Sequence, residues 1–169
     1  MKPSYVLYGI LAGAVLIWLL SSLGTPEEGK IRAQLDKVAE LVAKDGEEKA
    51  LESADKARRL GELFTDEMVI ALRPVGMEIH SPAELVRPFV GLRQGVDTLG
   101  VSFDVEELTV AEGHPTASMT ARATVVGRGT QQNGRQAFRL KLAWKKVRGT
   151  WLIESFDVVE QLDGNLLSL

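Results

Sequence analysis

The sequence predicts an α+β domain, with three helices in its first half and a mainly antiparallel sheet in its second half, behind one apolar N-terminal helix. Three observations support this fold class. Residues 5–23 carry no charged side chain, and residues 26–94 contain three stretches with apolar residues at helical spacing. From Val101 onward, apolar and polar residues alternate between turn sequences, which is typical of strands with one buried face.

The charge-free segment begins at Tyr5 and ends at Leu23. A helix rises about 1.5 Å per residue, so this segment just crosses a hydrocarbon core of about 30 Å. We expect an uncleaved transmembrane anchor. A cleaved signal peptide is the alternative, but its apolar region usually runs about 7–15 residues and ends in a small-x-small site. Here the run is longer, and the triplet at 22–24 (SLG) lacks the usual alanines.

Charges around the segment set its expected orientation. Lys2 precedes it, and Glu27 and Glu28 follow it closely. The positive-inside rule then leaves the N-terminus in the cytoplasm and places the following domain on the periplasmic side of a bacterial inner membrane. Gly9 and Gly13 have the spacing that lets two membrane helices approach closely, although such spacing also arises by chance.

The amino-acid composition excludes several kinds of catalytic and metal-binding site. The chain of 169 residues has no Cys, two His and a formal net charge of −3. Disulfides, Cys-ligated zinc, thiol catalysis and a His-rich metal site are therefore excluded. No concentrated basic stretch suggests nucleic-acid binding. We expect one soluble domain with no cofactor and no metal.

Capping signals mark two of the three helices. Thr25 followed by Pro26 predicts the start of the first helix, and Asp45-Gly46 interrupts its apolar stripe. A second helix is expected over residues 47–64, with four inward residues: Leu51, Ala54, Leu60 and Leu63. Ser81 predicts the start of a third helix, which Pro88 should kink or shorten.

Strands are expected over residues 68–73, 77–80, 101–111, 116–128, 135–148 and 150–161. Asn133-Gly134 is a strong signal for a two-residue hairpin turn, which would place Val125 opposite Leu142. Arg148-Gly149 predicts the next turn and places Trp144 opposite Ile153.

The register after Ile153 has two possible solutions. Without a bulge, Asp157 points into the apolar face of the sheet. A bulge near Glu154 instead sends Phe156 and Val158 inward and Asp157 outward. The number of apolar residues facing inward favours the bulge.

This order of elements resembles the nuclear transport factor 2-like superfamily, also called SnoaL-like or cone-fold proteins, over about residues 28–161. The sequences that carry the resemblance are LFTDE at 63–67, PVG at 74–76, the helix opening at Ser81-Pro82 and GTWLI at 149–153. The resemblance implies three helices packed on a curved, mainly antiparallel sheet, a cone-shaped half-barrel with an apolar pocket at its open end. It also implies frequent dimerisation through the outer sheet face. The expected divisions are tail and anchor at 1–24, the domain at 25–162 and a loose tail at 163–169.

Candidates for catalysis in such a cone are few. Proton-transfer chemistry needs a buried carboxylate or imidazole and a donor for the developing oxyanion. The only tyrosines, Tyr5 and Tyr8, lie in the apolar segment. Asp157 and His80 remain as weak catalytic candidates, the first conditional on the missing bulge and the second more simply a partly exposed residue before a helix cap. The expected pocket-lining residues are Phe138, Leu140, Leu142, Trp144, Val125 and Ile153.

The function expected from these features is that of a membrane-anchored, non-catalytic module that binds a partner protein, a second copy of itself or a small apolar ligand. An isomerase- or hydrolase-like enzyme with an acid or His in the cone is the alternative. Four basic residues should share the outer sheet face and could meet an acidic partner or anionic headgroups, although a solvated face is the simpler explanation: Arg122, Arg139, Lys141 and Lys145.

Overall fold

The computed structural model describes residues 25–129 and 133–164. This part of the chain forms three helices, one short 3-10 turn and a seven-stranded sheet, so the predicted α+β class is confirmed. The helices are α2 (Pro26–Val42), α3 (Ala50–Gly61) and α4 (Pro82–Gln94), and the 3-10 turn is η1 (Arg73–Val75). The strands are β1 (Lys44–Asp45), β2 (Phe64–Leu72), β3 (Met77–Ile79), β4 (Thr98–Val110), β5 (Thr116–Arg128), β6 (Asn133–Val147) and β7 (Thr150–Gly164).

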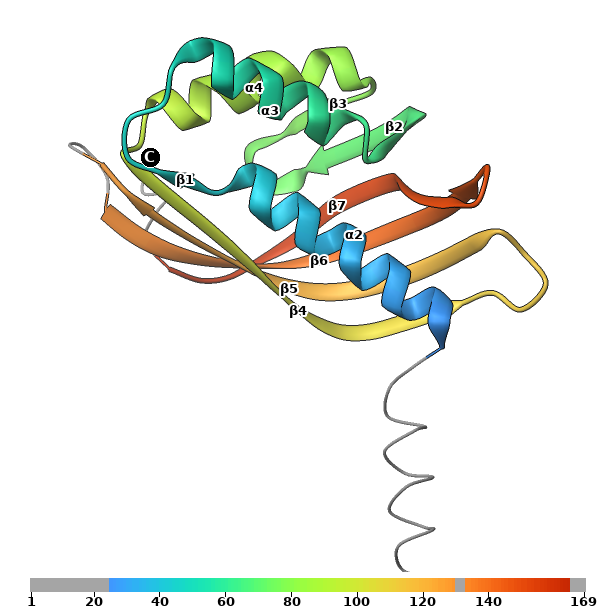
Figure 1. Cartoon of the computed structure of the whole chain (residues 1–169). Coiled ribbons are helices and arrows are strands. Elements are labelled where there is room, and N and C mark those ends of the chain that lie inside the picture. The colour runs from blue at the N-terminus through green and yellow to red at the C-terminus, as the bar shows by residue number, and fades with distance from the viewer. Residues whose placement is uncertain (1–24, 130–132, 165–169) are drawn as a thin grey trace, which may run out of the picture.

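The strand order in the sheet is β1-β4-β5-β6-β7-β2-β3. Every neighbouring pair is antiparallel except β2 and β7, which run parallel. The ladders of β4 with β5, β6 with β7 and β2 with β7 contain register shifts, which bend strands and increase their twist. Figure 1 shows the resulting curved sheet, with α2 crossing one side of its concave face and α3 and α4 above the other side.

Local capping fixes the helix starts, as predicted. The Thr25 hydroxyl accepts a hydrogen bond from the Glu28 amide at 3.3 Å, and the Ser81 hydroxyl accepts one from the Glu84 amide at 3.4 Å. Helix α4 passes through Pro88 and continues to Gln94, so the expected shortening is wrong. A proline removes one helical hydrogen bond, and buried residues on either side of it hold the helix against the core.

Helix α3 is shorter than predicted. It begins at Ala50, and Leu51 in its first turn is 81% exposed rather than inward. The buried face follows Ser53, Ala57 and Leu60, at the i, i+4, i+7 spacing of one helix side. The chain then enters β2 at Phe64, earlier than expected, and the short strand β1 was not predicted at all.

The hairpin between β5 and β6 differs from the expectation. Arg128 pairs with Asn133, so Asn133-Gly134 opens β6 instead of forming the turn, and Val125 lies opposite Gln136. The Asn133 side chain accepts a hydrogen bond from the Gly129 amide at 3.1 Å and thereby closes a longer connection. The register moves by an even number of residues, so each side chain keeps its predicted face.

The hairpin between β6 and β7 matches the prediction. Arg148 and Gly149 have φ values of 50° and 86°, as a type I′ turn requires, and Trp144 pairs with Ile153. Ala143 then pairs with Ser155, so Glu154 is the extra residue of a bulge. The predicted bulge is confirmed, and β7 continues beyond the expected end to Gly164.

The core lies between the concave face of the sheet and the three helices. Its most deeply buried residues include Ile31 and Leu35 from α2, Met68 from β2, and Trp144 and Ile153 from the hairpin. In the part of the chain covering residues 25–129 and 133–164, no helix is both long and apolar enough to cross a membrane. The expected anchor at 5–23, with its Gly9 and Gly13, lies outside the described residues.

Candidate functional site

Few polar residues are buried in the described part of the chain. They are Gln34, Ser53, Arg93 and Gln136, each at most 9% exposed. This set contains two amides, a hydroxyl and a guanidinium, and the carboxylate of Glu48, whose side chain is 8% exposed, lies directly beside the guanidinium. None of the four residues in this set is an ordinary general acid or base.

Arg93 is the most unusual member of this set, because its side chain is fully buried. It lies on the same face of α4 as Leu85 and Phe89, and its guanidinium sits 5.2 Å from the centre of the Phe89 ring. Its Nε and Nη2 donate to the two carboxylate oxygens of Glu48 at 2.7 and 2.8 Å. A bidentate pair of this kind is the strong form of an Arg–carboxylate contact.

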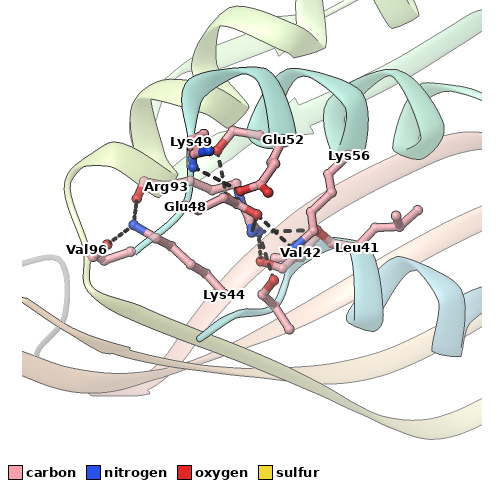
Figure 2. A network of polar contacts seen from close by, with 11 residues as sticks. Leu41, Val42, Lys44, Glu48, Lys49, Glu52, Lys56, Arg93 and Val96 are labelled. Carbon is pink, nitrogen blue, oxygen red and sulfur yellow. Dashed lines mark hydrogen bonds and ion pairs between the residues drawn. The ribbon is translucent and has the colours of Figure 1, made fainter. Parts of the chain in front are cut away.

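The third nitrogen of Arg93 caps another helix. Nη1 donates to the carbonyl oxygens of Leu41, Val42 and Ala43 at the C-terminal end of α2 (Figure 2). These carbonyls have no partner within the helix, and the helix end carries partial negative charge. The buried guanidinium of Arg93 donates hydrogen bonds to these carbonyls and also offsets the partial negative charge of the helix end.

Lys44 provides the reciprocal contact. Its ammonium donates to the carbonyl oxygens of Arg93 and Val96, at 2.7 and 2.6 Å, where α4 ends (Figure 2). A cation from α4 thus caps α2, and a cation just after α2 caps α4. The two helix ends and β1 are fixed to one another by this exchange.

Glu48 completes the network and joins it to α3. Its carboxylate also accepts from the Ser53 hydroxyl at 2.7 Å and pairs with Lys56 at 2.8 Å. The hydrogen bonds from Arg93, and secondarily those from Lys56 and Ser53, hold the pKa of Glu48 far below its usual range despite an opposing effect of burial. Glu48 is therefore a permanent carboxylate at any pH near neutrality.

Two hollows open beside this network, and both are lined by Lys44, Asp45 and Lys56. The first, of about 460 Å³, lies against α3 and is rich in acids. The second, of about 560 Å³, lies where β1 meets β4 and reaches Val126 and Arg128 on β5. Neither hollow lies inside the cone.

A second polar cluster fixes the start of α2. The carboxylate of Glu27 accepts from Lys146 and from the indole of Trp151, both at 2.7 Å, and pairs with Lys30. The hydrogen bond from Lys146, followed by those from Lys30 and Trp151, lowers the pKa of Glu27 to about 2. The amide of Gln34, about two turns further along α2, donates to the Trp151 carbonyl at 3.0 Å.

The two catalytic candidates from the sequence both lie outside the core. Asp157 forms a bidentate pair with Arg73, at 2.8 Å to Nε and 2.6 Å to Nη2, and this contact lowers the pKa of Asp157. The side chain of His80 is 60% exposed and lies 3.5 Å from Glu78. The backbone amide of His80 donates to the Glu84 carboxylate as part of the α4 cap.

The six expected pocket-lining residues divide into two groups. Leu140, Leu142, Trp144 and Ile153 are at most 3% exposed and belong to the packed core, whereas Phe138 and Val125 are half-buried. None of the six lines either of the two hollows.

The four basic residues predicted on the outer sheet face do share it. Arg139 pairs with Glu160 at 2.8 Å and with Glu106 at 3.6 Å, and Lys145 pairs with Glu154 at 3.5 Å. The remaining two lie opposite acids in the ladder, Arg122 facing Asp104 and Lys141 facing Asp157. Each of these four basic residues therefore lies near an acid.

Sequence reasoning missed both the Arg93 network and the Glu27 cluster. One signal was available for the first: Leu85, Phe89 and Arg93 recur at four-residue spacing, which places a cation on the apolar face of a helix. A buried arginine needs an anionic partner, so this pattern predicts a pair but not which acid supplies it.

No protein-family model matches the sequence, and no curated protein matches it. Solved structures do match its fold. A putative scytalone dehydratase from Novosphingobium aromaticivorans aligns with a TM-score of 0.69 at 10% identity, over 85% of this chain and 89% of that chain. A hexachlorocyclohexane dehydrochlorinase aligns at 0.66 and 10% identity, over 84% and 89%.

A putative calcium/calmodulin dependent protein kinase II association domain from Xanthomonas campestris also aligns, with a TM-score of 0.60 at 10% identity over 78% of this chain and 87% of that chain. Proteins with enzymatic and with assembly names thus share this architecture. Identities of this size establish the fold alone, and the described residues adopt the cone fold of the nuclear transport factor 2-like proteins.

Proposed function

We propose that this protein is a membrane-anchored, non-catalytic cone-fold module that binds a partner protein or a small apolar ligand at the bacterial inner membrane. The observation that carries the proposal is the composition of the buried polar set. In the described residues, the buried polar side chains are two amides, one hydroxyl, one guanidinium and the carboxylate of Glu48, which Arg93, Lys56 and Ser53 hold in its ionised form. A pocket built for proton transfer needs a titratable group facing the substrate.

The anchor rests on the sequence of residues 5–23, which is charge-free and long enough to span a bilayer. In this proposal Thr25, the first residue after the anchor region, caps α2 and leads directly into the domain. The binding module is thus carried close to the membrane surface, on the periplasmic side given by the flanking charges.

An isomerase- or hydrolase-like enzyme remains the second candidate, because neighbours in fold include proteins named as a dehydratase and a dehydrochlorinase. Its sequence-based candidates are poorly placed for such chemistry. Asp157 is engaged by Arg73 on the outside of the sheet, and His80 is exposed beside a helix cap.

Fractionation and co-purification of the full chain test the proposal. We expect the tagged chain to stay with membranes after alkaline carbonate and to enter solution with a mild non-ionic detergent. Stoichiometric partner protein or lipid should accompany it. A mature chain that begins near Thr25 and sediments with soluble proteins would contradict the anchor. Turnover of a substrate by the purified chain would contradict the non-catalytic assignment, and its loss on replacing Asp157 or His80 would support the enzyme alternative.

A further inference from the structure

We propose that the hollow at the junction of β1, β4 and β5 binds an anionic group, a carboxylate or phosphate, that carries a short apolar chain. This inference goes beyond the proposed function, because the hollow lies outside the cone and its occupation does not depend on the anchor. Its lining contains three cations, Lys44, Lys56 and Arg128, and one acid, Asp45.

The side chains around this hollow carry a net positive charge, because a single carboxylate, that of Glu48, is shared by two cations. Glu48 pairs with both Arg93 and Lys56. The ammonium of Lys44 is held by two backbone carbonyls, and no ion pair is recorded for it anywhere in residues 25–129 and 133–164. The C-terminal ends of α2 and α4 offset part of the excess, at about half a charge each. When Arg93, Lys56, Lys44 and Arg128 are counted against Glu48, Asp45 and the two helix ends, about one positive charge remains around the hollow.

The cation at the floor is held in place. Carbonyl oxygens at 2.6 and 2.7 Å fix two of the three N–H directions of Lys44, and the side chain is only partly exposed. An ammonium has three N–H groups, so one is left beyond these two contacts. Since the ammonium is already ordered by these contacts, binding an anion costs little further side-chain entropy.

The rest of the lining accounts for the apolar part of the ligand. Ala43, Leu99 and Val126 contribute apolar surface, and Gly100 leaves space where another residue would carry a side chain. Val126 is 41% exposed and has no apolar residue opposite it in β4. The volume of about 560 Å³ suits a small ligand rather than a macromolecule.

The acidic hollow beside α3 disfavours anions, so an anion should bind on the β4–β5 side of the network. Its lining includes five acids, which would repel an anion: Asp45, Glu47, Glu48, Glu52 and Asp55. An anion is therefore directed to the β4–β5 side, where Arg128 lies on the rim.

Isothermal titration of the full chain in a non-ionic detergent at low salt tests this site, with hexyl phosphate, hexanoate, inorganic phosphate and uncharged hexanol as probes. We expect hexyl phosphate and hexanoate to bind, with hexanol much weaker. Arg128→Gln should weaken the binding of both anions about threefold to fivefold, the size of an exposed charge contact. Arg122→Gln removes an exposed arginine from the outer face of the same strand and is the matched control, with no change expected.

Val126→Glu places an acid in the hollow at an exposed position and should lower anion affinity at least tenfold while the melting temperature stays unchanged. Equal losses for the Arg128 and Arg122 variants would show binding to general surface charge and would overturn the site. Equal affinity for inorganic phosphate and hexyl phosphate would overturn the apolar part of the proposal.

Discussion

Replacing Arg93 with Met tests the energetic role of the network that joins α2, α3 and α4. The substitution keeps the approximate length of a buried apolar stem and removes the guanidinium. Glu48, only 8% exposed, then loses its bidentate partner, and carbonyls at the end of α2 lose their donor. Removing one member of a buried ion pair costs about 3–5 kcal/mol, and we expect the free energy of unfolding to fall by that amount.

A double-mutant cycle separates this effect from loss of packing. Glu48→Gln in the Arg93→Met background leaves no buried carboxylate without its partner, and the ammonium of Lys56, which loses Glu48, is 34% exposed. The double variant should therefore be more stable than the sum of the single losses predicts, by about 2 kcal/mol or more. Arg93→Lys keeps the charge but not the planar fork and should fall between wild type and Arg93→Met. Arg87→Met, at an exposed position of the same helix, is the control and should change stability by less than about 0.5 kcal/mol.

Urea unfolding of the full chain in a non-ionic detergent measures these differences, because the buried indoles of Trp144 and Trp151 report on the fold. A loss below about 1 kcal/mol for Arg93→Met would refute the reasoning, since it would mean that Glu48 finds other partners at little cost. Strict additivity in the cycle would do the same, because the two residues would then act independently.

Three further predictions concern other parts of the fold. Trp144→Ala should lower stability by about 3–5 kcal/mol in the same unfolding assay, since Trp144 is fully buried; a change near zero would contradict its core position. Gly164→Ala should loosen the end of β7, because an added Cβ would lie 2.0 Å from the Arg135 carbonyl oxygen at a φ of +131°, and amide exchange there should accelerate. The comparison is Gly29→Ala in α2, where nothing lies within 4 Å and stability should rise by up to about 1 kcal/mol. The stabilisation from Glu27 should be fully present above its unfolded pKa near 4.5 and be lost as pH falls through about 2. Glu27→Gln should remove that part of the acid dependence of the melting temperature, and an unchanged acid profile would contradict it.

The sequence predicted features that depend on neighbouring residues. The caps at Thr25 and Ser81 need only a hydroxyl and an amide three residues away, and both form. The bulge at Glu154 was found because only that register turns Phe156 inward while Trp144 still meets Ile153. In these cases the local pattern contains the information.

Other features depend on contacts between residues far apart in the sequence, and the local pattern could not predict them. The Asn133-Gly134 turn failed because a shift by an even number of residues leaves the alternation of faces intact, so the pattern cannot choose among such registers. The partner of Arg93 is separated from it by 45 residues and becomes identifiable only when α3 packs against α4. The hollow proposed to bind anions combines β1, which is two residues long, with β4 and β5, and no sequence period signals so short a strand.

The cluster around Glu27 has a mechanical consequence. It fastens the first turn of α2 to Lys146 and Trp151, which belong to two strands in the middle of the sheet. The first turn of α2 therefore cannot unwind without breaking contacts to both strands, so the orientation of this helix end relative to the sheet is set by side chains that lie more than a hundred residues away in the sequence.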